Sequence, residues 1–260
     1  MSRLVLDKVS KSFGGLAAVA DLSFEVAEDR ITALIGPNGA GTTTTFNLIS
    51  GLLPPTSGHV TFDGRDLTRL LPHQVCRAGI GRSFQTPQTF GEMTVLENVM
   101  VASQWHAKSG FLAIGLRLAR ARADESVIRA RAMEQLAFLH LDHLADRRAG
   151  TLPLGQQRML EIARALATDP KVLLLDEPAA GLTRAEQGTL RKLLFEIRGC
   201  GIAILLVEHN MRFVFRTADH VVVLNFGRKL AEGPAAAIAQ DQRVIAAYLG
   251  QAPEIAHAQG

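Results

Sequence analysis

The first third of the chain alternates apolar and polar residues in the way that half-buried β-strands do. LVLDKVS (residues 4–10) and LSFEV (residues 22–26) both place apolar side chains at about every second position. A continuous apolar run, ITALI at residues 31–35, leads directly into a glycine-rich segment. Residues 44–53 have the composition of a helix that ends near a pair of prolines. The pattern therefore predicts two half-buried strands, followed by a strand–loop–helix unit.

The middle of the chain has a different character. Residues 92–147 contain almost no strand pattern, and residues 116–139 show helical periodicity with a basic polar face. A basic amphipathic helix is able to lie on a membrane surface. Asp124, Glu125 and Glu134 interrupt the positive charge here. We therefore favour a solvated helix that packs on one face.

An α/β pattern returns in the last hundred residues. Two continuous apolar runs, KVLLLD at 171–176 and IAILLV at 202–207, fit central strands of a parallel sheet covered on both faces. Helices are predicted at residues 155–167, 184–199 and 210–218, and a closing hairpin at residues 221–233. The final residues, 251–260, are expected to form a frayed tail.

Composition narrows the class of protein. The 260 residues carry a formal charge of +3, which is too weak a basic balance to indicate nucleic-acid binding. Cys76 and Cys200 lack metal-ligand spacing and are expected to be reduced, buried thiols. The N-terminus lacks the apolar run of a secretory signal, and the longest apolar runs have only the length of strands. We expect a cytoplasmic chain that does not itself cross a membrane.

The segment GPNGAGTTT, residues 36–44, nearly matches the phosphate-loop pattern G-x-x-x-x-G-K-[ST]. Gly36, Gly41 and Thr43 fit the pattern, but Thr42 stands where the pattern has lysine. Glycines let backbone N–H groups converge on phosphate oxygens, and the N-terminus of the next helix favours negative charge. The alternative is a plain glycine-rich turn between a strand and a helix.

Three ionisable side chains follow the two buried strands. Asp176 and Glu177 end the first strand, and His209 follows the second. Open α/β sheets bind ligands at this edge, where a carboxylate and the loop hydroxyl of Thr43 are able to hold Mg²⁺. Glu177 is then placed to act as a general base, and His209 to contact a γ-phosphate or to orient water. Taken singly, Asp176 and Glu177 are more typical of a strand-ending turn, and His209 of a solvated surface histidine.

Two further segments indicate a functional role only because they occur in the same chain as the motifs above. Gln85 precedes a proline-containing loop, where a neutral amide is able to contact Mg²⁺ or water. LPLGQQ, residues 152–157, places a glycine at a predicted helix start, which would offer a second anion-binding end. Two such ends in one chain allow one of them to complete a site on another subunit.

These motifs occur in the order and approximate spacing of ABC-transporter ATPase subunits, which the chain resembles from VSKSFGG (9–15) to the hairpin near residue 233. DEPAAGL, GQQRMLEIARAL, RSFQ and the terminal AAYLG are most similar to the branched-chain amino-acid importer branch. The resemblance implies an α/β fold, with a P-loop NTPase (RecA-like) core, an N-terminal antiparallel β-subdomain and a helical subdomain. It implies one cassette over residues 1–250, with the core and β-subdomain at 1–91 and 161–250, the mobile helical subdomain at 92–160, and a tail at 251–260.

The resemblance also implies a role for each matched position. ATP would be bound with Mg²⁺, and Phe13 would stack on adenine. The phosphates would be wrapped by Gly36, Pro37, Asn38, Gly39, Ala40, Gly41, Thr42, Thr43 and Thr44. Thr43, Gln85 and Asp176 would support the metal, Glu177 would be the catalytic base, and His209 would complete the γ-phosphate contacts. Residues 152–156, with Leu152, Gly155 and Gln156, would act on the ATP of the opposite subunit.

Two departures from the family pattern bear on activity. In Leu152-Pro153-Leu154-Gly155-Gln156 the family's serine is missing, and Pro153 supplies no N–H donor. Thr42 is the more serious, because it replaces an ammonium that lies between phosphate oxygens. Losing one hydrogen bond to a charged group costs about 1.5–3 kcal/mol. Arg30 and Arg82 are the candidate substitutes for the missing cation.

The resemblance implies a head-to-tail partnership with a second ATPase subunit, identical or related. It also implies integral permease subunits that hold the chain at the cytoplasmic face of the inner membrane, and no nucleic acid. The first hypothesis is an importer ATPase weakened by Thr42. The second is a non-hydrolysing cassette that regulates a heterodimer. A soluble ABC ATPase of DNA repair or translation is a third, less favoured because the chain is one compact cassette.

Overall fold

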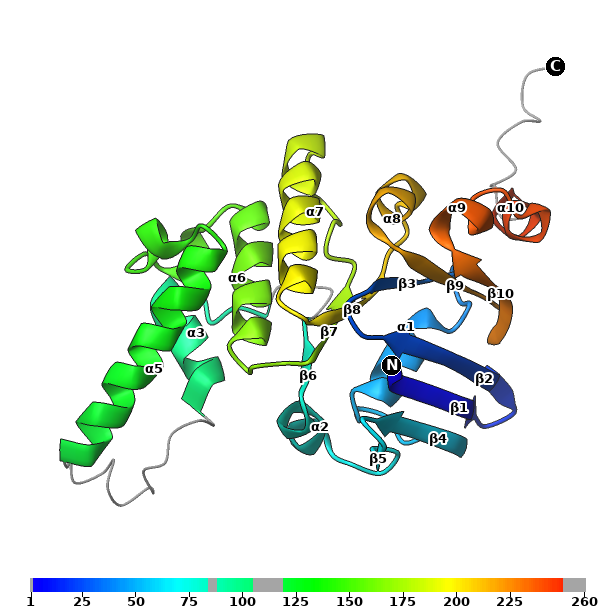
Figure 1. The fold of residues 1–260 in the computed structure, drawn as a ribbon, viewed down its shortest axis with the longest axis horizontal. Coiled ribbons are helices and arrows are strands. Elements are labelled where there is room, and N and C mark those ends of the chain that lie inside the picture. Colours follow the sequence, from blue (N-terminus) through cyan, green and yellow to red (C-terminus); the bar gives the residue numbers. More distant parts are fainter. Residues whose placement is uncertain (1, 84–87, 105–118, 250–260) are drawn as a thin grey trace.

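The computed structural model describes residues 2–83, 88–104 and 119–249, and these residues form two sheets with flanking helices (Figure 1). The smaller sheet is antiparallel, with strand order β2-β1-β4-β5. Its strands are β1 (Ser2–Phe13), β2 (Leu16–Ala27), β4 (Ser57–Phe62) and β5 (Arg65–Asp66). Burial along β2 alternates over most of its length, as the sequence pattern predicts.

The larger sheet has six strands in the order β10-β9-β3-β8-β7-β6. All neighbouring strands are parallel except the hairpin pair β9 and β10. The strands are β3 (Ile31–Ile35), β6 (Ile80–Arg82), β7 (Val172–Asp176), β8 (Ala203–Val207), β9 (His220–Asn225) and β10 (Arg228–Pro234). Every residue of β3, β7 and β8 is buried, which confirms that the continuous apolar runs are central strands.

The helices lie around the larger sheet and extend beyond it on the side of β6 and β7 (Figure 1). They are α1 (Thr42–Ile49), α2 (Pro72–Ala78), α3 (Val95–Ser103), α5 (Ala119–Phe138), α6 (Leu154–Leu166), α7 (Arg184–Gly199), α8 (Met211–Thr217), α9 (Ala235–Ile238) and α10 (Gln242–Leu249). Short 3₁₀ turns occur at Asp142–Leu144 and Ala149–Thr151. In the part of the chain described here, no helix combines the length and apolarity that crossing a bilayer requires.

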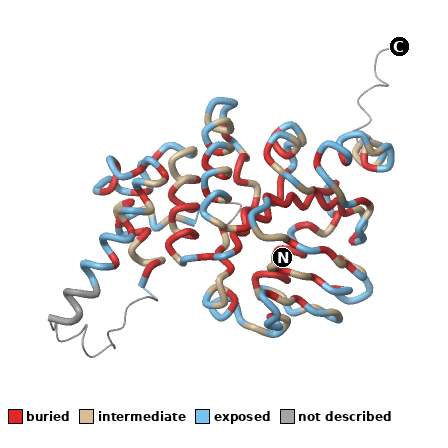
Figure 2. The backbone as a smooth tube through the Cα atoms, viewed as in Figure 1, coloured by how far each residue is buried: buried red, intermediate tan, exposed pale blue. Residues whose placement is uncertain are grey.

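The larger sheet separates two hydrophobic cores, and its buried strands lie between them (Figure 2). Leu173 and Leu175 of β7 face the core that includes α3, α5, α6 and α7. Val172 and Leu174 of the same strand face the core shared with α1 and the antiparallel sheet. This alternation follows from the period of two along a strand.

Several predicted boundaries need correction. The helix after the glycine-rich loop ends at Ile49, where Ser50 forms its C-cap, and does not reach the prolines. Helix α6 begins at Leu154, so Gly155 lies inside its first turn. Cys76 and Cys200 are both free, but Cys200 is exposed because it caps the end of α7 at the surface, and Cys76 is only half-buried. Helix α5 buries Ile128, Ala132 and Leu136 on one face, as expected of a packed helix.

Candidate nucleotide site

The glycine-rich loop turns tightly between β3 and α1. Gly41 has φ +102, and a Cβ atom there would lie 2.5 Å from the carbonyl oxygen of Ala18. A Cβ atom on Gly36 would lie 2.6 Å from the carbonyl oxygen of Leu224. The Ala40 N–H donates to the Pro37 carbonyl at 2.9 Å and closes the turn. Both glycines are therefore required by the close approach of other backbone segments.

Two C-terminal elements support this loop. The Gly227 N–H, in the turn between β9 and β10, donates to the Ala40 carbonyl at 3.0 Å. Tyr248 of α10 places its hydroxyl near the backbone of Gly36, and burial raises the pKa of that hydroxyl. Neither contact is predictable from the sequence pattern, although Tyr248 belongs to the terminal AAYLG segment that carries part of the family resemblance. The loop is thus held from both sides by residues distant in the sequence.

The four threonines at the start of α1 differ in exposure. Thr42 is buried, Thr43 is exposed, and Thr44 is half-buried. The Thr45 hydroxyl donates to the Gly41 carbonyl at 2.9 Å, so it is engaged within the helix. The exposed Thr43 hydroxyl lies in the first turn, beside the loop, as a metal-ligating hydroxyl requires. A buried threonine at position 42 offers a short, uncharged group in place of the expected ammonium.

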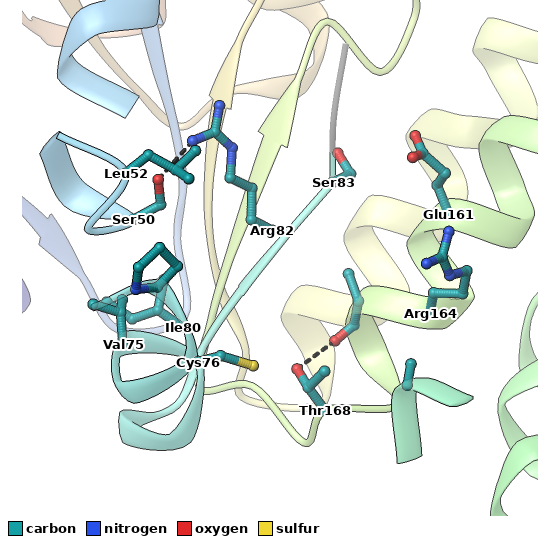
Figure 3. A pocket seen from close by; sticks show the side chains of 13 residues that line it. Ser50, Leu52, Val75, Cys76, Ile80, Arg82, Ser83, Glu161, Arg164 and Thr168 are labelled. Atoms are coloured by element: carbon teal, nitrogen blue, oxygen red, sulfur yellow. Dashed lines mark hydrogen bonds between the residues drawn. The ribbon is translucent and has the colours of Figure 1, made fainter. Parts of the chain in front are cut away.

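Neither arginine substitute supplies that missing charge to the loop. Arg30 is exposed and precedes β3, whereas the loop follows β3, so Arg30 lies at the opposite edge of the sheet. Arg82, at the end of β6, donates instead to the far end of α1, where it reaches Asn47 Oδ1 at 2.9 Å and Ser50 Oγ at 2.6 Å. Figure 3 shows the Arg82 side chain directed toward Ser50, beside a cavity of about 250 Å³. The suggestion that Arg30 or Arg82 replaces the lysine is therefore wrong on geometry.

Arg82 also forms a buried ion pair with Asp176. Its Nη2 atom lies 3.3 Å from Asp176 Oδ2, and both side chains are at most one-tenth exposed. Burial raises the pKa of Asp176, although the nearby Arg82 opposes that shift. Burial likewise lowers the pKa of the Arg82 guanidinium. The pair links the carboxylate that ends β7 to helix α1.

Glu177 and His209 face each other across the ends of β7 and β8. Glu177 Oε1 lies 3.2 Å from His209 Nε2. Glu177 has φ +48, a left-handed conformation that is uncommon for glutamate, and its N–H donates to the Val207 carbonyl at 2.9 Å. The glutamate is four-fifths buried while the histidine is nearly half exposed. This strained, partly desolvated position is typical of functional residues.

Glu208 is a buried carboxylate that the sequence analysis did not single out. Its Oε1 atom accepts the Ala179 N–H at 2.7 Å, and its Oε2 atom accepts the His209 N–H at 3.2 Å. Burial raises the pKa of Glu208, while these backbone donors act in the opposite direction. One side chain thus fixes the loop after β7 and the loop after β8 relative to each other. In the sequence, only its place beside His209 was a signal.

The segment 152–156 packs against the loop after β7. Leu152 is buried, and Pro153 is the N-cap of α6. A Cβ atom on Gly181 would meet Leu154 Cδ2 at 2.7 Å, and one on Gly155 would meet Glu186 Oε1 at 2.4 Å. Gln156 Oε1 is buried and has no hydrogen-bond partner among the described residues. The start of α6 therefore lies beside the loop after β7 and the first turn of α7.

Phe13 ends β1 and is half exposed, with the Lys11 Nζ atom 5.3 Å from the centre of its ring. An exposed ring at the edge of the sheet is free to stack on a ligand. Gln85 lies outside the described residues. Just after it, the Gln88 N–H donates to Glu161 Oε1 at 2.8 Å, and Arg164 donates to the Gln88 carbonyl. Helix α6 therefore anchors the chain where it leaves the segment that contains Gln85.

The donor set suits Mg²⁺ held together with phosphates. Within residues 2–83, 88–104 and 119–249, no three His, Cys, Asp or Glu side chains gather as a ready-made metal site. Mg²⁺ keeps several waters and uses one or two protein oxygens plus substrate phosphates, so such a cage is not needed. Asp176 and the Thr43 hydroxyl provide oxygen donors of this kind, and the backbone N–H groups of a glycine-rich loop are suited to bind phosphate.

Comparisons with known proteins agree with this geometry. The family model of the ABC transporter matches residues 19–180, and that of the branched-chain amino acid ATP-binding cassette transporter matches residues 228–254. The chain is 42% identical to the high-affinity branched-chain amino acid transport ATP-binding protein BraF of Pseudomonas aeruginosa, over 97% of this chain and 100% of BraF. It is 42% identical to LivG of Salmonella typhimurium, over 96% of this chain and 98% of LivG.

Solved structures give the same result. The ADP conformation of an ATP-binding cassette of an ABC transporter aligns with a TM-score of 0.85 and 34% identity, over 96% of this chain and 100% of that one. A dimeric bacterial ABC transporter cassette aligns with a TM-score of 0.76 and 25% identity, over 89% of this chain and 98% of that one.

An α/β fold with a phosphate loop, carboxylates at the ends of β7 and β8, and these matches define one class of protein: the chain belongs to the ATP-binding cassettes of ABC transporters, which are ATPases coupled to transport. Within that family it groups with the cassettes of branched-chain amino acid transport.

Proposed function

We propose that the chain is the ATP-hydrolysing subunit of an importer for branched-chain amino acids, and that Thr42 weakens both its ATP binding and its hydrolysis. The observation that carries this proposal is the contact between Glu177 and His209, 3.2 Å apart at the edge of the sheet that also holds Asp176. A cassette that had lost hydrolysis altogether would have no use for this strained arrangement.

Each group in the site has a role in the proposal. Residues 36–44 hold the phosphates, Phe13 stacks on adenine, and Thr43, Asp176 and Gln85 support Mg²⁺, which neutralises charge on the phosphates. Glu177 takes a proton from the attacking water, and His209, whose Nε2 atom lies beside Glu177, completes the γ-phosphate contacts. Glu208 fixes the backbone of His209.

Assembly follows from the same residues. We place Leu152, Gly155 and Gln156 against the ATP of a second subunit, because the start of α6 packs beside the loop after β7 and Gln156 Oε1 lacks a partner among the described residues. The helical part, 92–160, would then move relative to the core, 1–91 and 161–250, as two subunits close. Permease subunits would hold the pair at the cytoplasmic face of the membrane.

The decisive experiment is Thr42→Lys in the full chain, with ATP affinity and steady-state hydrolysis as readouts. Restoring one charged hydrogen bond should tighten ATP binding about ten- to hundred-fold. The hydrolysis rate should rise by more, because negative charge develops on the phosphates in the transition state. Thr44→Lys adds the same charge two residues away and should produce neither gain.

A second candidate function, a non-hydrolysing regulatory cassette, rests on Thr42 alone. If Thr42→Lys tightens ATP binding and leaves hydrolysis at background, this second function is correct and the first is wrong. The transported substrate needs its own test: with the permease subunits present, leucine, isoleucine or valine with their binding protein should stimulate hydrolysis. Absence of stimulation by all three would overturn the substrate assignment without affecting the Thr42 result.

A further inference from the structure

A groove between α7 and α8 is lined by four arginines and has a volume of about 410 Å³. Arg184 and Arg191 come from α7, and Arg212 and Arg216 come from α8. The two helices pack side by side (Figure 1). Spacings of seven and of four residues put each pair on one face of its helix, so all four side chains line the same groove. We refer to these four residues as the arginine pocket.

The arginine pocket has no counter-charge of its own. Within the described part of the chain, no ion pair is found for any of its four arginines, and no acidic residue lines the groove. Other arginines of the same region do find carboxylates: Arg198, further along α7, binds Asp219 at 2.9 Å. Glu186, in the first turn of α7, is engaged by Thr183 in the helix cap. Asp219 and Glu186 are thus committed elsewhere, and Glu196 of α7 does not line the groove.

Two details distinguish the arginine pocket from a solvated charged surface. Arg191 Nε is buried and has no hydrogen-bond partner among the described residues. Gly188 lies in the interior of α7, and a Cβ atom added there would meet nothing within 4 Å. Glycine destabilises a helix interior relative to alanine, and packing does not demand it at this position. Its effect is to keep the groove between Arg184 and Arg191 open.

The arrangement also opposes the stability of the helices that carry it. Arg212 and Arg216 are like charges four residues apart on one helix face, which repel each other. Arg184 begins α7, where the helix dipole disfavours a positive charge. A bound anion would reduce both of these unfavourable electrostatic interactions and would accept a hydrogen bond from the buried Nε atom of Arg191.

We propose that the arginine pocket binds a small molecule that carries at least two adjacent phosphate groups. Guanidinium groups bind phosphate oxygens in pairs through their fixed fork of N–H donors. Four of them around one groove match a diphosphate better than a single anion. The amides of Gln187 and Asn210, which are joined by a hydrogen bond of 3.4 Å, add neutral polar groups to the same lining. The volume of the groove falls in the ordinary range for small-ligand sites.

This site is separate from the nucleotide site and independent of the function proposed above. The nucleotide phosphates are assigned to the loop at residues 36–44, none of which lines the arginine pocket. Asn210 follows His209 directly, so a ligand in the arginine pocket would adjoin the segment that holds the histidine. The site would therefore be able to report the level of a phosphorylated metabolite to the ATPase.

The test uses inorganic pyrophosphate as the probe and isothermal titration of the full chain as the measurement. Because the phosphate loop also attracts pyrophosphate, all proteins carry Gly39→Asp, which puts a negative charge into that loop. Gly39 has φ +79 and open space around its Cβ position. Asp29 and Asp63 already adopt positive φ in this chain, and aspartate tolerates this region better than most side chains do. Thermal unfolding of each variant establishes that it is folded.

In the Gly39→Asp background, we expect pyrophosphate to bind with micromolar affinity. Arg191→Gln combined with Arg216→Gln should weaken this binding at least tenfold. The matched control, Lys192→Gln combined with Arg129→Gln, removes the same charge from exposed positions outside the groove and should change the affinity by less than threefold.

Three results would overturn the proposal. If pyrophosphate binds the wild-type chain but not the Gly39→Asp variant with an intact arginine pocket, the anion binds at the nucleotide site. Equal losses in the pocket variant and in the control variant would mean that overall charge alone attracts the anion. A tetraglutamate peptide that binds more tightly than pyrophosphate would make the groove a docking site for an acidic protein segment.

Discussion

The loop side and the carboxylate side of the proposed nucleotide site are formed by different kinds of chemical groups. The loop side, residues 36–44, relies on backbone N–H groups and on Gly36 and Gly41, where a Cβ atom would clash with other backbone segments. The carboxylate side relies on side chains: Asp176 with Arg82, Glu177 with His209, and Glu208 beneath them. Thr42 removes charge from the first side and leaves the second complete. We therefore expect Thr42 to weaken the proposed phosphate site while the side chains proposed for hydrolysis stay in place.

The largest effect is expected on the carboxylate side. Glu177→Gln keeps the shape of the side chain but cannot accept a proton. In the Thr42→Lys background it should lower the steady-state hydrolysis rate about 10²- to 10⁴-fold, the usual contribution of a general base. ATP affinity, measured in the same proteins, should stay within threefold. An unchanged rate of ATP hydrolysis in this variant would show that Glu177 is not the general base. The contrast drawn between the two sides of the site would then be wrong.

Arg82→Gln tests the link between the two sides. It leaves the buried Asp176 without its partner, so the free energy of unfolding should fall by about 3–5 kcal/mol. Chemical denaturation at pH 7 measures this change. Arg131→Gln is the control, because Arg131 and Asp169 form a shorter pair, 3.0 Å, that is about half exposed. Its loss should cost at most about 1 kcal/mol. Equal costs for the two variants would show that burial is not what stabilises the Arg82 pair.

Glu208→Gln tests the support beneath the carboxylate side. It replaces the acceptor of the His209 N–H by an amide and should cost about 1–3 kcal/mol near pH 4.5. Burial raises the pKa of Glu208, so the folded state holds this proton more tightly than the unfolded state does. The stability that Glu208 contributes is therefore present below its unfolded pKa and is lost as the pH rises through its folded pKa.

The difference in unfolding free energy between wild type and Glu208→Gln should accordingly narrow from pH 4.5 to pH 8, as measured by denaturation at several pH values. A difference that widens over this range would mean that the backbone donors outweigh burial at Glu208, and that its pKa is lowered in the folded protein.

The smallest expected effect is on the unfolding free energy, and it comes from comparing substitutions of two glycines, Gly188 and Gly41. Gly188→Ala should raise the unfolding free energy by up to about 1 kcal/mol, because a Cβ atom fits there and alanine favours the helix. Gly41→Ala is the counterpart on the loop side and should destabilise the protein, since its Cβ atom would lie 2.5 Å from the Ala18 carbonyl oxygen. Thermal unfolding compares the two. A destabilising Gly188→Ala would mean that packing, and not an open groove, requires this glycine.

Local signals in the sequence were enough to predict most of the fold. Helix α7 was predicted with both of its ends from the helical pattern of residues 184–199, and the structure adds the capping box that Thr183 and Glu186 form at its start. Strand β6 was not predicted, since its three residues, Ile80–Arg82, become a strand only through pairing with β7. Asp176, Glu177 and His209 follow parallel strands in the sequence. Their positions therefore predict that they lie at one edge of the sheet.

The contacts that a sequence does not reveal are those between distant side chains and backbone. Glu208 is an ordinary charged residue in VEHN, and its bond to Ala179 exists only because two loops meet in space. Arg82 was considered as a replacement cation for the loop, yet it is committed to Asp176 and to the end of α1. Both cases concern the direction of a long side chain, which periodicity and spacing do not specify.

Because the six-stranded sheet divides the two hydrophobic cores, substitutions in one core have little effect on packing in the other. Leu173 and Leu174 are joined by one peptide bond but belong to separate apolar volumes. A substitution at one of them is compensated by neighbours that the other never touches. The core that contacts α3, α5 and α6 and the core that contains α1 are therefore able to repack independently of each other.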